Sequence, residues 1–277
     1  MASWTRRPTS HLSIRLDGMD AFIQRRDVPL VGPVLKDSAI IFSSGPNGIL
    51  GRRQVFSLGW PEENGDLRVA AKMAISMQKK LAASGCRVQM VVPPWPRMTR
   101  PDEPTVNGMT TAVSQLFRDP YSRCGALIRF ARSAHPFAMV PDLLRAYPRV
   151  RAVVAVPSRD QIRGWTRDLN RAGLARPVLT SKEWRGSRHP LVVVTSLQML
   201  DHCSDFDFDL VIVPDARVLR RIDGRPIDYD DPHPPRDYRL LRHWHIPAFG
   251  FLPDWERLHP GEERRMWSLF ACTIEVG

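Results

Sequence analysis

Short apolar runs recur through the second half of the chain and predict buried strands. The runs are rich in Val and Ile, and helical patterns separate several of them. Runs of this kind are typical of parallel strands that are covered on both faces. They are GALIRF (125–130), AVVAV (152–156), PVLT (177–180), LVVVTS (191–196), DLVIV (209–213) and IPAFGFL (246–252). The pattern predicts an α/β fold, with a parallel sheet and helices on both of its faces.

Helical periodicity is clearest in two segments. Residues 66–85 carry an apolar stripe that ends at Gly85, and the strand pattern CRVQMVV follows at 86–92. Residues 159–173 place Ile162, Trp165 and Leu169 on one face, which predicts a helix packed on the sheet. The opposite face of this helix carries an arginine at every fourth position, namely Arg159, Arg163, Arg167 and Arg171.

Composition divides the chain into four parts. Residues 1–20 are predicted to be a basic arm, and residues 21–92 a small α/β domain. Residues 93–104 hold five prolines and are predicted to be a linker. Residues 105–277 contain the parallel sheet. The acid-poor beginning also resembles an organellar transit peptide, so import into an organelle stays open beside a cytoplasmic, nucleoid-associated location.

The net charge of +11 predicts a partner with a phosphate backbone. The excess is concentrated in residues 1–100, where 15 basic side chains stand against 7 acidic ones. The four cysteines show no paired spacing, which favours a reducing compartment without disulfides or a zinc site. His243 and His245 could both bind a metal ion, but the sequence offers no third ligand nearby, so no metal is expected. No apolar run is long enough to span a membrane.

Five segments in this order carry a family resemblance. They are ALIRFARSAHPF (126–137), VVAVPSRDQIRGW (153–165), HPLVVVTSLQML (189–200), DLVIVPDARVL (209–219) and IPAFGFLPDWERLHPGEERRMWSLFACTIEV (246–276). The series resembles the first RecA-like domain of superfamily 2 DNA helicases, in particular the XPB-like and UvsW-like branch. In that branch a small DNA-contacting domain precedes the motor. The resemblance implies a RecA-like domain in residues 105–277, and the second RecA-like domain is expected to be absent.

The nucleotide motifs of that family are altered here. The family's phosphate loop reads Thr-Gly-Ser-Gly-Lys-Thr, and this chain has Arg-Ser-Ala-His-Pro-Phe at 132–137. Its glycines and lysine are therefore missing, and both are needed to cradle phosphates. Pro214 stands where an Asp holds Mg²⁺, and Asp215 where a Glu acts in hydrolysis. Residues 252–254 replace the coupling Thr-Ala-Thr. The degenerate nucleotide site comprises Ser133, His135, Pro136, Phe137, Pro214 and Asp215.

The DNA-facing motifs are kept. Ser158 and Arg159 match a motif that touches the DNA backbone, and Thr195 and Ser196 match a later one. Ser196 is equally suited to cap a helix. Three further arginines, Arg163, Arg52 and Arg53, are candidates because of their position and charge. For the arginine face of the helix at 159–173, a solvated surface with local Asp–Arg pairs is the alternative interpretation.

The preferred hypothesis is a helicase-derived DNA-binding protein that cannot hydrolyse ATP. It would act as a non-catalytic subunit or recruiter on duplex or branched DNA, with a protein partner and without ATP, Mg²⁺ or another cofactor. One alternative is a protein-interaction component in which the old nucleotide cleft is filled or faces a partner. Another is a residual ATP-dependent helicase subunit that a partner completes. An unrelated hydrolase built on His135 and Asp215 is a further, weaker alternative.

Overall fold

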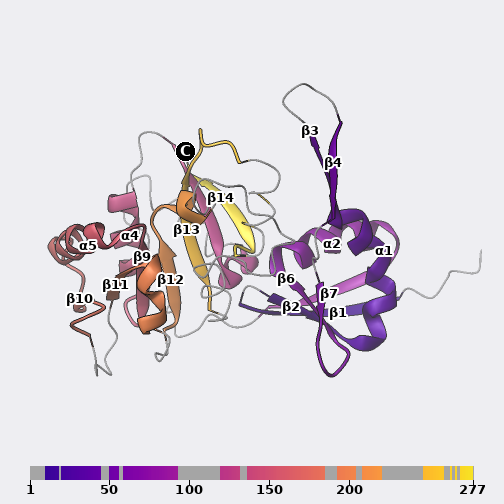
Figure 1. The fold of residues 1–277 in the computed structure, drawn as a ribbon. Helices are drawn as coiled ribbons and strands as arrows, with labels where there is room; N and C mark the ends of the chain where they lie inside the picture. Colours follow the sequence, from indigo (N-terminus) through magenta and orange to yellow (C-terminus); the bar gives the residue numbers. More distant parts are fainter. Residues whose placement is uncertain are drawn as a thin grey trace, which may run out of the picture.

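The computed structural model contains two α/β units, which lie side by side in Figure 1. The larger one is built on a seven-stranded sheet and the smaller one on a five-stranded sheet. Described residues are 10–18, 20–44, 50–55, 59–92, 119–131, 136–184, 192–203, 208–219, 246–258, 263, 266 and 269–276. The predicted linker at 93–104 and the histidine pair at 243 and 245 lie outside them. No helix in the described part of the chain is long and apolar enough to cross a membrane.

The amino-terminal unit is a mixed sheet with the strand order β5-β6-β2-β1-β7. The strands β1, β2, β6 and β5 pair antiparallel in turn, and β7 pairs parallel to β1. Its strands are β1 (His11–Asp17), β2 (Asp20–Ile23), β5 (Gly59–Pro61), β6 (Leu67–Ala70) and β7 (Arg87–Val91). Its helices are η1 (Arg25–Asp27), α1 (Val28–Ala39) and α2 (Ala71–Ala83). The predicted strand at 86–92 is therefore present, and α2 begins five residues later than the helical pattern.

The structure corrects the predicted arm, because residues 11–17 form a strand inside this sheet. Leu12, Ile14 and Leu16 of β1 are buried against the helices, and the residues between them are more exposed. This alternation is the signature of a strand with one covered face. β1 pairs with β7, which lies about seventy residues further along the chain. The small domain consequently begins about ten residues before the predicted boundary.

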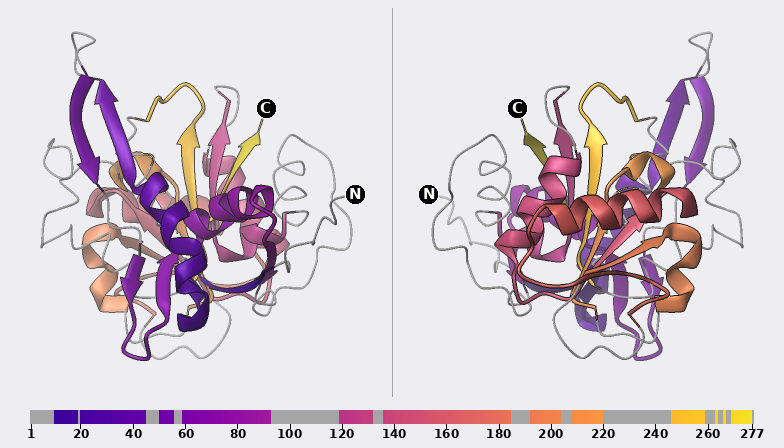
Figure 2. Two further views of the ribbon diagram at one scale, coloured as in Figure 1. Left: turned by 90° about the vertical axis from the view of Figure 1, so that its right-hand side faces the viewer. Right: turned by 90° about the vertical axis from the view of Figure 1, so that its left-hand side faces the viewer.

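A separate hairpin projects from the amino-terminal unit. It consists of β3 (Ile40–Ser44) and β4 (Leu50–Val55), which pair antiparallel with an irregularity after Phe42. Figures 1 and 2 show it standing clear of both sheets. Its backbone carries two of the candidate arginines, Arg52 and Arg53. Their side chains lie outside the described part of the structure.

The carboxyl-terminal unit has a fully parallel sheet with the order β10-β11-β9-β12-β13-β8-β14. Its strands are β8 (Ala126–Phe130), β9 (Ala152–Val156), β10 (Val178–Thr180), β11 (Val192–Ser196), β12 (Leu210–Val213), β13 (Ala248–Pro253) and β14 (Cys272–Val276). Its helices are η2 (Pro120–Cys124), α4 (Pro136–Ala146), α5 (Arg159–Arg171), η3 (Leu197–Cys203) and η4 (Ala216–Leu219). Each predicted strand of this sheet is present.

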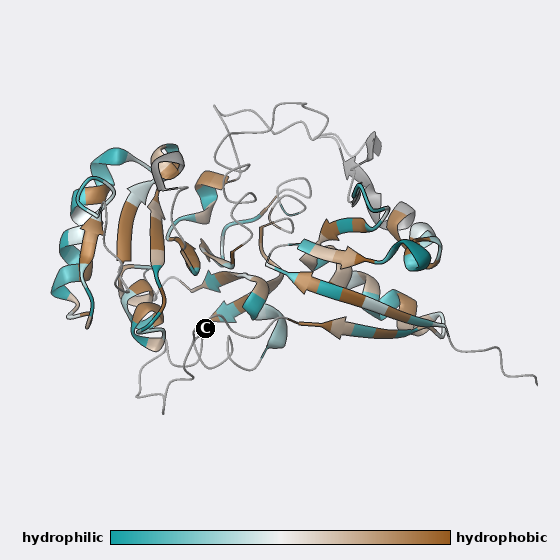
Figure 3. Cartoon of the chain, turned by 90° about the horizontal axis from the view of Figure 1, so that it is seen from below, coloured by the Kyte–Doolittle hydropathy of each residue, from teal (hydrophilic) through white to brown (hydrophobic). Residues whose placement is uncertain are grey.

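Both faces of this sheet are covered, as the apolar runs predict. In β9, Val154 packs into the core beneath α4 and α5, and Val153 packs into the core on the opposite face. The opposite core includes Leu197 of η3 and Leu219 of η4. Figure 3 shows the contrast between the inner strands of the larger sheet, which are mainly hydrophobic, and the alternating strands of the smaller one. The predicted α/β fold, with a parallel sheet covered on both faces, is confirmed.

Direct contacts join the two units. Cys124 and Ala271 of the carboxyl-terminal unit belong to the core of the amino-terminal unit. The Tyr121 hydroxyl donates a hydrogen bond of 2.8 Å to Oε1 of Gln78 on α2. Burial raises the pKa of Tyr121, so this hydroxyl remains a donor at neutral pH. Apolar burial and this hydrogen bond therefore hold the amino-terminal unit against the segment that leads into the amino-terminal end of β8.

Candidate functional site

A cavity of about 520 Å³ lies at the carboxyl ends of β8, β9, β12 and β13. In open parallel sheets, ligands bind at this edge. The cavity is lined by Phe130, Pro136, Phe137, Pro157, Gln161, Gly164, Trp165, Arg167, Asp168, Pro214, Asp215, Arg217, Phe251, Pro253 and Trp255. The structure thus brings together four of the residues assigned to the degenerate nucleotide site, namely Pro136, Phe137, Pro214 and Asp215. Ser133 and His135 lie outside the described residues.

Each strand that ends at the cavity is followed or terminated by a proline. Pro136 begins α4 after β8, Pro157 follows β9, Pro214 follows β12, and Pro253 ends β13. Proline has no backbone N–H to donate. A phosphate cradle depends on such donors at strand-to-helix turns. Four positions on the wall of this cavity therefore cannot contribute to one.

The carboxylate of Asp215 is engaged by a neighbouring arginine. Its Oδ1 accepts hydrogen bonds from the backbone N–H and Nε of Arg217, at 3.0 and 2.8 Å, and Oδ2 accepts from Nη2 at 2.8 Å. These bonds raise the pKa of Arg217 above its usual value, since they favour the charged guanidinium. Both carboxylate oxygens of Asp215 therefore accept hydrogen bonds from the same guanidinium, in a bidentate pair.

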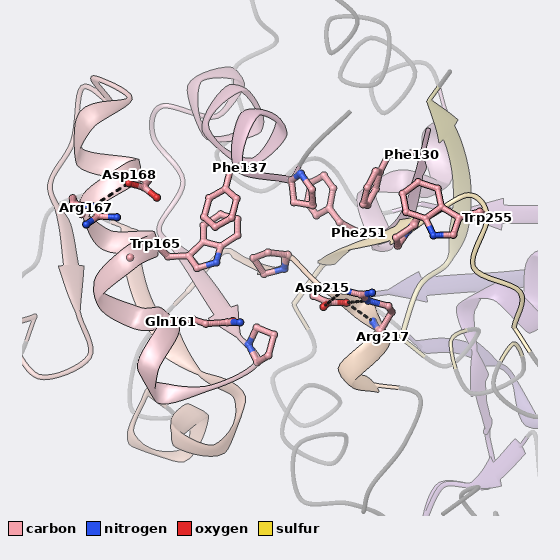
Figure 4. A pocket seen from close by; sticks show the side chains of 15 residues that line it. Phe130, Phe137, Gln161, Trp165, Arg167, Asp168, Asp215, Arg217, Phe251 and Trp255 are labelled. Carbon is pink, nitrogen blue, oxygen red and sulfur yellow. Dashed lines mark hydrogen bonds and ion pairs between the residues drawn. The ribbon is translucent and has the colours of Figure 1, made fainter. Parts of the chain in front are cut away.

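Aromatic rings flank the cavity on two sides. Phe137 of α4 and Trp165 of α5 stack with their centroids 4.1 Å apart and their planes at 21°. Phe130 and Trp255 meet edge to face, with their centroids 6.1 Å apart. Figure 4 shows the first pair on one side of the cavity and the second on the other, with Asp215 and Arg217 below and between them. The cavity is therefore walled by π surfaces and proline rings.

The sequence of α5 explains its orientation on the sheet. Trp165 and Leu169 are buried against the strands, and Ile162 is partly buried beside them. The right-hand view in Figure 2 shows the helix lying across the face of the sheet. Its four arginines are all exposed, and Arg167 also lies on the cavity wall; they are Arg159, Arg163, Arg167 and Arg171. The predicted apolar and basic faces are both confirmed.

The local ion pairs expected for a merely solvated face are sparse. Arg167 Nε lies 3.2 Å from Asp168 Oδ1. Within the described part of the chain, neither of the pairs Asp160–Arg163 and Asp168–Arg171 is formed. Arg159 and Arg163 therefore extend into solvent without a described carboxylate partner, as a phosphate-binding face requires.

The other candidate contacts differ in their accessibility. Ser158 stands at the N-cap of α5, is half-buried, and makes no capping hydrogen bond with its side chain. Thr195 and Ser196 are fully buried, and their hydroxyls meet no hydrogen-bond partner among the described residues. In this conformation neither hydroxyl reaches solvent, so their contact with DNA stays a prediction that requires local opening of β11.

Metal and thiol chemistry find no support in the described residues. No group of three or more His, Cys, Asp or Glu side chains there is placed to hold a metal ion. Burial raises the pKa of Cys124 to about 12 and also raises that of Cys272. Both thiols are consequently protonated at neutral pH, which does not favour a role as nucleophiles.

Sequence reasoning missed much of the cavity wall, including Trp165, which was assigned to the buried face of its helix, and Trp255, which was given no role in the site. One signal was present: three apolar strands end in Val-Pro or Leu-Pro, at Pro157, Pro214 and Pro253. In parallel strands such ends meet at one edge of the sheet.

Gly164 offers a test of α5 packing, because it lies inside the helix and lines the cavity. A Cβ added at this position would meet no atom within 4 Å. Since Gly is a poor helix former, Gly164→Ala is expected to raise the free energy of unfolding by about 1 kcal/mol. Chemical denaturation would measure the gain; a loss would show that α5 is packed differently.

Comparisons with known proteins identify the fold. No protein-family model matches the chain, and no curated protein sequence matches it. Among solved structures, the UvsW helicase from bacteriophage T4 is similar, with a TM-score of 0.59 and 11% sequence identity. The match covers 96% of this chain and 99% of that one, so both units are included. At this identity the likeness shows a helicase-like fold.

Proposed function

We propose that this chain is a helicase-derived DNA-binding protein that does not hydrolyse ATP. The observation that carries the proposal is the cavity at the carboxyl ends of the strands, where four prolines stand and Asp215 is engaged by Arg217. Phosphoryl transfer depends on positioning by a lysine, Mg²⁺ and a water-orienting carboxylate. The residues at these positions supply none of the three functions.

DNA binding is assigned to the outer face of α5 and to the hairpin β3–β4. Arg159 and Arg163 are exposed on α5, with the Ser158 hydroxyl at its beginning. Arg52 and Arg53 lie on the projecting hairpin. The similarity to a helicase structure and the net charge of +11 support a nucleic-acid partner. Both surfaces would hold the phosphate backbone of duplex or branched DNA, independently of its sequence.

Calorimetry on one preparation tests both parts of this function. ATP with Mg²⁺ at 1 mM is expected to give no heat of binding. Duplex DNA is expected to bind, and its affinity to fall about 40-fold between 50 and 200 mM salt if about three phosphates are contacted. DNA binding by the same sample shows that the protein is folded, which makes the ATP result decisive.

The other outcomes separate the alternatives. Saturable ATP binding would favour a residual helicase subunit that a partner completes. Absence of DNA binding would overturn the proposal and favour a protein-interaction component. Isolation of a stoichiometric protein partner without nucleic acid would support that second function. A partner isolated together with DNA would instead fit a non-catalytic subunit or recruiter.

A further inference from the structure

The cavity retains an open volume that the loss of ATP chemistry does not explain. A cleft without a ligand would be expected to close by apolar packing, yet about 520 Å³ remains. This volume falls within the range of about 300–1,000 Å³ that is typical of small-molecule sites. The cavity is therefore large enough for a ligand of several fused or linked rings.

Two aromatic side chains on the cavity wall are strongly exposed to solvent. Among the large apolar side chains of the described residues, only Leu30, Val91, Phe137 and Trp255 are strongly exposed. Phe137 is 43% exposed and Trp255 is 45% exposed, and both line the cavity. Exposed apolar surface that gathers at a concave site marks a binding surface. The rings come from different elements, α4 and the segment after β13, so one helix face does not account for them.

The charges on the wall are internally compensated. Arg217 is paired with Asp215, and Arg167 with Asp168. With the prolines removing backbone donors, the wall offers little to a phosphate group. Gln161 remains as a neutral polar group, and Figure 4 shows its side chain pointing from α5 toward the cavity. Its amide can donate and accept hydrogen bonds at the edge of a planar heterocycle.

We infer that this cavity binds a small planar aromatic molecule that carries no phosphate. The ligand would lie between the Phe137–Trp165 stack and the Phe130–Trp255 pair, with an edge within reach of Gln161. A single aromatic side chain from a partner protein would leave much of the cavity empty, so a free small molecule fits better. The inference goes beyond DNA binding and shares with the proposed function only the exclusion of ATP.

The uncharged fluorophore N-phenyl-1-naphthylamine is a suitable probe, because its emission increases in apolar sites. The wild-type protein is expected to bind one molecule saturably. Gly164→Phe should reduce the affinity at least tenfold, because the new side chain enters the cavity where a Cβ has free space. Phe137→Ala should reduce it about tenfold by removing half of the stack. The control Leu30→Ala removes an exposed apolar side chain from the other unit and should leave binding unchanged.

The result that would overturn the inference is non-saturable binding, or equal binding by wild type and Gly164→Phe when circular dichroism shows that both are folded. Competition with adenosine and ATP tests the phosphate condition: adenosine should displace the probe at lower concentration than ATP. The reverse order would overturn both this inference and the claim that ATP is excluded. If the inference about the cavity is wrong but the proposed function is right, the probe will not bind while duplex DNA still does. Failure of this inference can therefore be told apart from failure of the proposed function.

Discussion

Arg163→Glu is expected to weaken binding to duplex DNA about tenfold at 0.1 M salt, and the double variant Arg159→Glu, Arg163→Glu about a hundredfold. Both side chains are exposed on the outer face of α5, and neither has a described carboxylate partner. Each loses a phosphate contact and gains a repulsive charge. Because each contact releases a counterion, the slope of log affinity against log salt should fall by about one per contact. Fluorescence anisotropy over a salt series measures both quantities.

Arg149→Glu is the matched control, since it makes the same change in net charge. Arg149 is exposed in the turn between α4 and β9, at the opposite edge of the sheet from the cavity. Its substitution should change affinity by no more than about twofold at 0.1 M salt, where charges are screened beyond about 10 Å. Equal losses for Arg149→Glu and Arg163→Glu would show that only the overall charge matters. If neither variant changes the affinity, the DNA binds to another part of the protein surface.

The larger sheet could be predicted because burial on both faces leaves a direct mark on the sequence. All residues of β9, β11 and β12 are buried, which explains their uninterrupted apolar runs. The helix α5 was equally clear, since Trp165 and Leu169 recur at helical spacing beside exposed arginines. In these segments local pattern and tertiary environment agree, so the sequence alone suffices.

The smaller unit was harder because its local signals are weak or contradictory. α1 contains Gly32 and Pro33 in its interior, which normally argue against a helix, and tertiary packing of Val31 overrides them. β1 has a short alternating pattern inside a basic segment, so its charge suggested an arm. Its pairing with β7 depends on a contact between distant parts of the chain. No local periodicity contains that information.

The cavity, too, could be predicted from the sequence only in part. The altered motifs around Pro136 and Pro214 were visible because they interrupt a known order of elements. The aromatic wall was not, since Trp165 and Trp255 are far apart in sequence and reach opposite sides of one cavity only through the strand order β9-β12-β13-β8. Trp165 also serves the core, with 5% of its surface exposed, so its spacing indicated burial alone. A residue can satisfy a packing pattern and still present one edge to a ligand site.

Gly250→Ala is expected to lower the free energy of unfolding by about 1–3 kcal/mol, the usual cost of overpacking a core. Gly250 lies in β13 between β12 and β8, where Phe270 covers it. An added Cβ would stand 2.4 Å from Cζ of the Phe270 ring, well inside van der Waals contact. Phe270 is 3% exposed, so its ring has little room to move. For a chain of this length, the melting temperature should fall by a few degrees.

A double-mutant cycle identifies the cause of this loss. In the Phe270→Leu background the opposing ring is gone, so adding the Gly250 methyl group should cost much less than in the wild type. The coupling energy between the two sites should therefore be favourable and about 1 kcal/mol or more. Additive losses would show that Gly250 is required by the backbone of β13 and not by the ring. Because β13 also carries Phe251 and Pro253 to the cavity, the same cycle measured with the naphthylamine probe would show whether strain in this strand reaches the ligand site.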